Sequence, residues 1–190
     1  LELCSKTGLP VKVMPYLSQM LIDKEECSGN VFNYVKDIRI EDLLGREPVS
    51  FDEKAVKAFI ENKVCMVTGG GGSIGSEIVR QLADYNPERI IIVDIYENNA
   101  YDIQQEIIME HDGSTALETV IASVRDYDKM NKIFSMYKPQ IVFHAAAHKH
   151  VTLMETSPEE AVKNNVFGTY NVAELAGKYG AEKFIMISTD

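Results

Sequence analysis

A glycine-rich run is the part of the sequence whose residue types and spacing are best suited to chemistry. Residues 68–75 read TGGGGSIG, directly after the apolar residues 64–67 and before the helix-like segment 76–85. Because glycine has no Cβ, the backbone here can approach a diphosphate closely, and the first N–H groups of the following helix then point at its negative charge. A tight strand-to-helix turn without a ligand is the alternative interpretation. The run predicts a dinucleotide site that includes Gly69, Gly72, Ser73, Ile74 and Gly75.

Asp94 is predicted to hold the adenosine end of that dinucleotide. It ends the apolar run 89–93 and lies nineteen residues after Gly75. Dinucleotide-binding units place an acidic residue at about this distance, where it accepts hydrogen bonds from the ribose hydroxyls. Residues 95–98 contain no arginine, and an unpaired carboxylate repels a 2′-phosphate, so NAD is favoured over NADP. Alternatively, Asp94 caps the segment that follows it.

A second group of candidates lies in residues 144–151, which read HAAAHKHV after the apolar residues 141–143. The small side chains allow a flat cofactor to lie against the backbone. Lys149 suits the diphosphate or a hydroxyl of a nucleotide sugar, although it is equally interpretable as a solvated loop lysine. The three histidines have no carboxylate or cysteine partner in a recognised spacing, so no metal site is predicted. The candidate cofactor residues of this segment are Ala145, Ala146 and Ala147.

Residues 164–171, NNVFGTYN, are unusually polar for a buried helix. They form either an exposed face with a glycine for close packing, or a face on which Asn165 points at the edge of the site. In the second interpretation Asn165 orders the backbone near the fifth strand. We therefore include Asn165 among the candidate cofactor residues.

The elements that must position these residues alternate regularly from Asp52 onward. Short connections between strands and helices predict an α/β fold with a doubly wound parallel sheet of the Rossmann, NAD(P)-binding type. Asp52 is the expected N-cap of the first helix, and Ser157 with Pro158 and Glu160 predicts a capping box at the start of a long helix. The expected strands are 63–68, 89–94, 117–122, 141–144 and 183–187, and further helices are expected near 76–85, 98–111 and 126–137.

The predicted domains are residues 1–49, the tail of a preceding domain with its linker, and residues 50–190, the N-terminal part of the dinucleotide-binding domain. The alternative for residues 1–49 is an N-terminal extension of the dinucleotide-binding domain itself. The first segment is too short for a core of its own. The chain ends at Asp190, immediately after the last expected strand, so we expect the C-terminal substrate region to be missing.

The composition excludes several classes of partner. A net charge of −10 over 190 residues argues against nucleic-acid and anionic-membrane binding, which require basic surfaces. No apolar stretch approaches the roughly 20 residues needed to span a bilayer. Three scattered cysteines without a CxxC spacing suit a reducing, cytoplasmic compartment.

Four motifs together carry a family resemblance: TGGGGSIG, HAAAHKHV, NNVFGTYNV and the terminal FIMISTD. They resemble extended short-chain dehydrogenases and, more narrowly, the polysaccharide-biosynthesis branch of the nucleotide-sugar 4,6-dehydratases that act on UDP-N-acetylglucosamine. Residues 40–49 resemble the linker before the catalytic domain in long, membrane-anchored members. The resemblance implies transmembrane helices upstream of this chain, anchorage at the inner face of the cytoplasmic membrane, and a homo-oligomer.

The resemblance also assigns roles to individual residues. Thr189 and Asp190 match the active-site Thr-Asp pair, in which the threonine hydrogen-bonds the 4-oxygen of the sugar and the aspartic acid assists loss of the C6 hydroxyl. Ser123, Val124 and Arg125 match the segment that contacts adenine, where many relatives carry an aspartate at the first position. Serine can still form a hydrogen bond, so we expect adenine binding to be altered and not lost.

The implied activity is 4,6-dehydration of a UDP-N-acetylhexosamine. Hydride moves from C4 of the sugar to NAD, water leaves from C5 and C6, and the hydride returns to C6. The alternatives are a 4-epimerase or reductase on the same scaffold, and a non-catalytic NAD-binding module. Because the lysine that normally follows Asp190 is missing, we expect this chain to bind dinucleotide weakly and to turn nothing over.

Overall fold

The computed structural model describes residues 12–13, 36–37, 52–113 and 115–188. The chain divides into two compact units, Leu1–Phe51 and Asp52–Asp190. In the first unit, β1 (Lys12–Val13) pairs antiparallel with β2 (Lys36–Asp37). The origin of residues 1–49 in a preceding domain stays a prediction.

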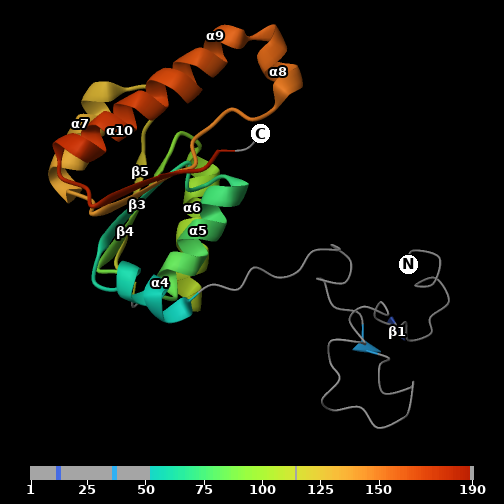
Figure 1. Cartoon of the computed structure of the whole chain (residues 1–190), viewed down its shortest axis with the longest axis vertical. Helices are drawn as coiled ribbons and strands as arrows, with labels where there is room; N and C mark the ends of the chain where they lie inside the picture. Colours follow the sequence, from blue (N-terminus) through green and yellow to red (C-terminus); the bar gives the residue numbers. More distant parts are fainter. Residues whose placement is uncertain (1–11, 14–35, 38–51, 114, 189–190) are drawn as a thin grey trace. The chain divides into compact units, whose positions relative to one another are not determined.

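The second unit is built on a five-stranded sheet with the order β5-β4-β3-β6-β7, in which every pairing is parallel (Figure 1). From β3 the chain moves outward through β4 to β5, and then returns to the other side of β3 for β6 and β7. The point where the direction reverses, between β3 and β6, is where such sheets bind ligands at their carboxyl ends. The predicted fold class is therefore confirmed. The strands are β3 (Val64–Thr68), β4 (Arg89–Asp94), β5 (Leu117–Ile121), β6 (Ile141–His144) and β7 (Lys183–Met186).

Helices cover both faces of this sheet. In Figure 1, α5 and α6 lie on one side of the sheet, and α7 and α10 lie on the other. No helix among the residues with described positions is both long and apolar enough to cross a bilayer. The helices are α4 (Glu53–Ile60), α5 (Ser73–Ala83), α6 (Glu97–Glu110), α7 (Tyr127–Tyr137), α8 (Val151–Thr156), α9 (Pro158–Ala161), the π-helix η2 (Val162–Gly168) and α10 (Thr169–Lys178).

Each face of the sheet has its own hydrophobic core. Successive side chains of a strand point to opposite faces, so β3 contributes Cys65 and Val67 to the core under α5 and α6, and Met66 to the core under α7 and α10. The inner strands β3, β4 and β6 read as nearly continuous apolar runs because both of their faces are covered.

Of the two helix caps predicted from the sequence, one is present in the structure and one is not. Asp52 caps α4 as predicted, since its carboxylate accepts hydrogen bonds from the backbone N–H groups of Lys54 (3.0 Å) and Ala55 (3.2 Å). The capping box predicted at Ser157 is wrong, because the Ser157 side chain makes no capping hydrogen bond. Glu160, its expected partner, instead accepts from Arg125 and Lys163.

The predicted single long helix is confirmed, because α9, η2 and α10 follow one another without a break from Pro158 to Lys178, although the π-helical stretch within it was not predicted. The helix after the glycine loop begins at Ser73, three residues before the expected start at residue 76. The last residues of the loop therefore form the first turn of α5.

Candidate functional site

The glycine loop connects β3 to α5 at the carboxyl edge of the sheet. Gly69 has a φ of 72°, and its N–H donates to the carbonyl of Val93 (2.8 Å). A Cβ at Gly69 would lie 2.7 Å from the carbonyl oxygen of Ala145, and a Cβ at Gly75 would collide with the carbonyl of Gly69. Glycine is therefore required at both positions. At Gly69 it permits the turn and the close contact with the loop after β6, and at Gly75 it lets α5 pack closely against the glycine loop.

The N-terminus of α5 has unused hydrogen-bonding capacity. The first N–H groups of any helix lack partners within the helix, and Gly72, the N-cap residue of α5, has no side chain that could satisfy them. The first turn carries no acidic residue, and the Nζ of Lys149 lies 3.4 Å from the Oγ of Ser73. The structure thus brings two residues predicted from separate motifs together at a helix end that favours an anion.

Asp94 connects the glycine loop to the start of α6. Its side chain is buried (8% exposed); Oδ2 accepts from the N–H of Gly71 (2.8 Å), and Oδ1 accepts from the N–H of Tyr96 (2.8 Å). The alternative that Asp94 caps the following helix is not borne out, because the N-cap of α6 is Tyr96 and α6 has no side-chain capping hydrogen bond. Each carboxylate oxygen has a second acceptor position, so two positions remain for ribose hydroxyls. Within the described part of the chain, Asp94 forms no ion pair with lysine, arginine or histidine.

His144 lies buried below the loops, with both ring nitrogens engaged. Nδ1 is 2.7 Å from the hydroxyl of Thr68, and Nε2 is 2.9 Å from the hydroxyl of Thr169. The side chain is 3% exposed, and this burial lowers the pKa of His144 to about 4. Over the residues that the structure describes, no three acidic, histidine or cysteine side chains gather in a way that could hold a metal ion. Sequence reasoning considered His144 as a metal ligand and missed this network, although Thr68 and His144 end adjacent strands.

Two asparagines of η2 hold the loop that follows β6. The Oδ1 of Asn165 accepts from the N–H of His148 (2.9 Å), and its Nδ2 donates to the carbonyl of His148 (2.9 Å). Asn164 donates from its Nδ2 to the carbonyl of Ala146 (3.1 Å). Asn165 does point at this edge of the sheet, but the expectation that it orders the backbone near the fifth strand is wrong, because its partner is the loop after β6. π-helical turns often occur at functional sites, and here one turns adjacent asparagines toward the same loop.

The predicted adenine segment is connected to the helices of the α7 and α10 layer. Ser123 accepts through its Oγ from the N–H of Arg125 (3.3 Å), and Asn171 donates to the carbonyl of Val124 (3.1 Å). Val124 is buried, and a Cβ at Gly168 would lie 2.7 Å from its Cγ2. The guanidinium of Arg125 pairs with Glu160, so of these candidates Ser123 keeps a hydroxyl proton free for a ligand.

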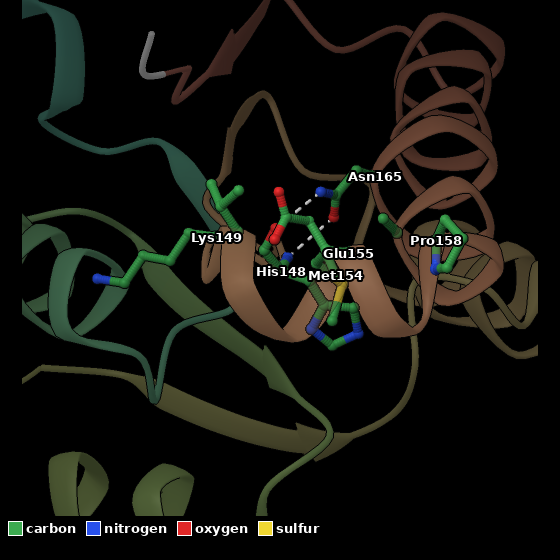
Figure 2. A pocket seen from close by; sticks show the side chains of 8 residues that line it. His148, Lys149, Met154, Glu155, Pro158 and Asn165 are labelled. Carbon is green, nitrogen blue, oxygen red and sulfur yellow. Dashed lines mark hydrogen bonds between the residues drawn. The ribbon is translucent and has the colours of Figure 1, made fainter.

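A cavity of about 390 Å³ lies beside this edge, between the β6 loop, α8, α9 and η2. Figure 2 shows the side chain of Lys149 extending away from Asn165 and Pro158, while Asn165 bonds to the backbone of His148. Thr189 and Asp190, the candidate catalytic residues, lie outside the described residues. The lining residues are His148, Lys149, Val151, Met154, Glu155, Pro158, Ala161 and Asn165.

Comparison with known proteins agrees with the resemblance found in the sequence. Residues 65–190 match the family described as polysaccharide biosynthesis proteins. The chain is 44% identical to the probable polysaccharide biosynthesis protein EpsC of Bacillus subtilis, over 98% of the chain and 30% of EpsC. It is 33% identical to a UDP-N-acetylglucosamine 4,6-dehydratase (inverting) of Campylobacter jejuni, over 67% of the chain and 36% of that enzyme.

A solved structure extends the comparison to the fold. The UDP-glucose 4-epimerase of Stenotrophomonas maltophila, with bound NAD and formylated UDP-arabinopyranose, matches with a TM-score of 0.60 and 25% identity. The match covers 67% of this chain and 37% of the epimerase. The chain thus spans about a third of the length of the curated relatives that it matches.

Proposed function

Because the chain belongs to the polysaccharide biosynthesis protein family, we propose that it supplies the cofactor-binding part of an NAD-dependent enzyme that modifies a nucleotide sugar. The observation that carries this proposal is the pairing of two features at one sheet edge. The uncapped N-terminus of α5 suits a diphosphate, and Asp94, bonded to Gly71 of the same loop, suits the adenosine ribose.

The residues present fit such a dinucleotide. The N–H groups at the start of α5, with Ser73 nearby, hold the diphosphate, and Asp94 accepts from the ribose hydroxyls. The small side chains of the alanines 145–147 let a flat ring lie against the backbone, and Gly69 brings the glycine loop into contact with Ala145. When bound, NAD accepts hydride from a sugar carbon and returns it. The free carboxylate of Asp94 disfavours a 2′-phosphate, which supports NAD over NADP.

The finer proposal is 4,6-dehydration of UDP-N-acetylglucosamine during synthesis of a surface polysaccharide. Its support is the motif resemblance together with the C. jejuni relative, which carries that name. Asp190 donates a proton to the departing C6 hydroxyl, Thr189 hydrogen-bonds the 4-oxygen, and Lys149 neutralises the diphosphate of the substrate. A cytoplasmic location and self-association belong to the same proposal.

A 4-epimerase is the second candidate, since the S. maltophila structure with NAD and a UDP-sugar shares this fold. The two reactions differ in product. Dehydration of UDP-N-acetylglucosamine gives a 4-keto-6-deoxy sugar, whereas epimerisation keeps the C6 hydroxyl and inverts C4.

The test has two stages. Calorimetric titration of the protein with NAD and with NADP examines the cofactor site, and Asp94→Ala is the matched variant that should lose NAD binding. Incubation of the whole enzyme with UDP-N-acetylglucosamine and NAD, followed by mass spectrometry, then looks for loss of water, with Asp190→Asn as the control, because this chain alone is expected to turn nothing over. Absence of NAD binding would refute the proposed function, and inversion at C4 without loss of water would replace the dehydratase by the epimerase.

A further inference from the structure

We propose that His144 is a positioning residue that sets the spacing between the glycine loop and η2, and thereby the affinity for the dinucleotide. This inference rests on the proposed cofactor site. It assigns a function to a buried polar side chain whose hydrogen bonds go to Thr68 and Thr169 and not to the helix terminus of α5 or to Asp94.

His144 joins three segments that border the site. Thr68 is the last residue of β3 and directly precedes Gly69, and His144 is the last residue of β6 and directly precedes Ala145. Thr169 is the first residue of α10 and directly follows η2. The hydrogen bonds of 2.7 Å to Thr68 and 2.9 Å to Thr169 therefore span the glycine loop, the alanine loop and the helix that bears the two asparagines.

The charge state of the ring fixes the direction of these bonds. Because desolvation lowers the pKa of His144 to about 4, the ring is neutral near pH 7. A neutral imidazole has one N–H donor and one acceptor nitrogen. One threonine hydroxyl must therefore accept from the ring while the other donates to it, and loss of either link leaves a buried polar atom without a partner.

A small displacement of His144 would also move the residues of the proposed cofactor site, because β6 is in close contact with the strands on both sides of it. The backbone of β6 is joined to both neighbours here, since Ala145 N–H donates to the carbonyl of Thr68 (2.9 Å) and Ile187 N–H donates to that of His144 (2.9 Å). Gly69 lies so close to Ala145 that not even a Cβ fits between them. Any change in the spacing of β3 and β6 must therefore move the glycine loop or the alanine loop.

Two conservative substitutions separate the two links. The side-chain amide of asparagine reaches the position of Nδ1, and that of glutamine reaches the position of Nε2. His144→Asn therefore keeps the bond to Thr68 and loses the bond to Thr169, whereas His144→Gln does the reverse. Thr169→Val removes the second link from the partner side, and Thr169→Ser retains it.

The ligands are ADP and NAD. In the proposed site ADP would contact only the glycine loop and Asp94, whereas the nicotinamide half of NAD would extend further, toward the alanines 145–147 that follow β6. We expect His144→Asn and Thr169→Val to leave ADP affinity unchanged and to raise the Kd for NAD about tenfold, as an unsatisfied buried polar group does. His144→Gln should weaken both ligands, and Thr169→Ser should restore NAD affinity. Calorimetry on the folded protein, with circular dichroism to count the folded fraction, measures these values.

Val142→Ala is the control for a merely structural effect, because Val142 is a fully buried residue of the same strand without a polar contact. It should lower the free energy of unfolding and leave both affinities per folded molecule unchanged. Equal affinities in the wild type and all His144 and Thr169 variants would overturn the inference, as would equal loss in Val142→Ala. If the His144 variants do not fold, the comparison of the Kd for NAD between Thr169→Val and Thr169→Ser tests the inference by itself. Absence of NAD binding by the wild type would refute the proposed function and this inference together.

Discussion

Acid should destabilise this fold through His144 before the paired carboxylates of Glu106, Glu160 and Glu182 are protonated. The imidazole is 3% exposed and has a pKa of about 4 in the folded protein, against 6.5 for an ordinary histidine. In the unfolded chain the ring regains its ordinary pKa. Between these two values the unfolded state binds a proton that the folded state does not bind.

The sign and size of the effect follow from this difference. Stability is complete above about pH 6.5, is lost as the pH falls toward 4, and changes no further through this group below the folded pKa. Within that window the free energy of unfolding should fall by about 1.4 kcal/mol per pH unit, and by about 3 kcal/mol in total. The paired carboxylates Glu106, Glu160 and Glu182 have lowered pKa values, so their contributions are lost at lower pH.

Urea denaturation followed by circular dichroism, at several pH values between 7 and 4, measures the effect. The reference is His144→Gln, which keeps the link to Thr169 but does not titrate. The difference in unfolding free energy between the wild type and this variant isolates the histidine, because the other titrating groups are common to both proteins. A difference that stays constant over the whole range would refute the reasoning.

Three other predictions concern the site and its core. Asp94→Asn removes the charge but keeps the size of the side chain, so titration calorimetry should show weaker NAD binding and a smaller preference for NAD over NADP; an unchanged preference would contradict the assigned role. Asn165→Ala deletes both hydrogen bonds to the backbone of His148, so the His148 amide should exchange hydrogen about tenfold faster or more, with Asn98→Ala on α6 as the control. Burial raises the pKa of the Cys65 thiol to about 12, so Cys65 should react with a thiol reagent near pH 8 only after unfolding, and rapid labelling of folded protein at this residue by mass spectrometry would refute its burial.

The sheet could be predicted from the sequence almost residue by residue. The expected strands 89–94 and 141–144 match β4 and β6 at both ends, because an apolar run bounded by a polar or turn residue is a local signal. The prediction that the glycine loop and Asp94 form a dinucleotide site rests on the same kind of local signal, because dinucleotide-binding units have a characteristic spacing between their glycines and the acid.

Other features depend on contacts between distant residues and could not be predicted in this way. Thr68 and His144 are 76 positions apart, and their bond requires knowing that β3 and β6 are neighbours. The capping box at Ser157 failed because Glu160 pairs with Arg125, which is 35 positions away. The π-helical turn has no sequence signal that we recognised, so Asn165 was assigned to the correct edge of the sheet but to the wrong partner.

The carboxylate of Asp94 holds the glycine loop by accepting from the N–H of Gly71 and, in the proposed function, also accepts from the ribose of the cofactor. The protein has therefore already ordered this loop, and a cofactor need not lose affinity in arranging it. Because one side chain has both roles, the ways in which the site could change during evolution are restricted. Replacing the acid by a residue without a side-chain acceptor would release the N–H of Gly71, so a change of coenzyme preference by that route would require a second substitution that anchors the loop in another way.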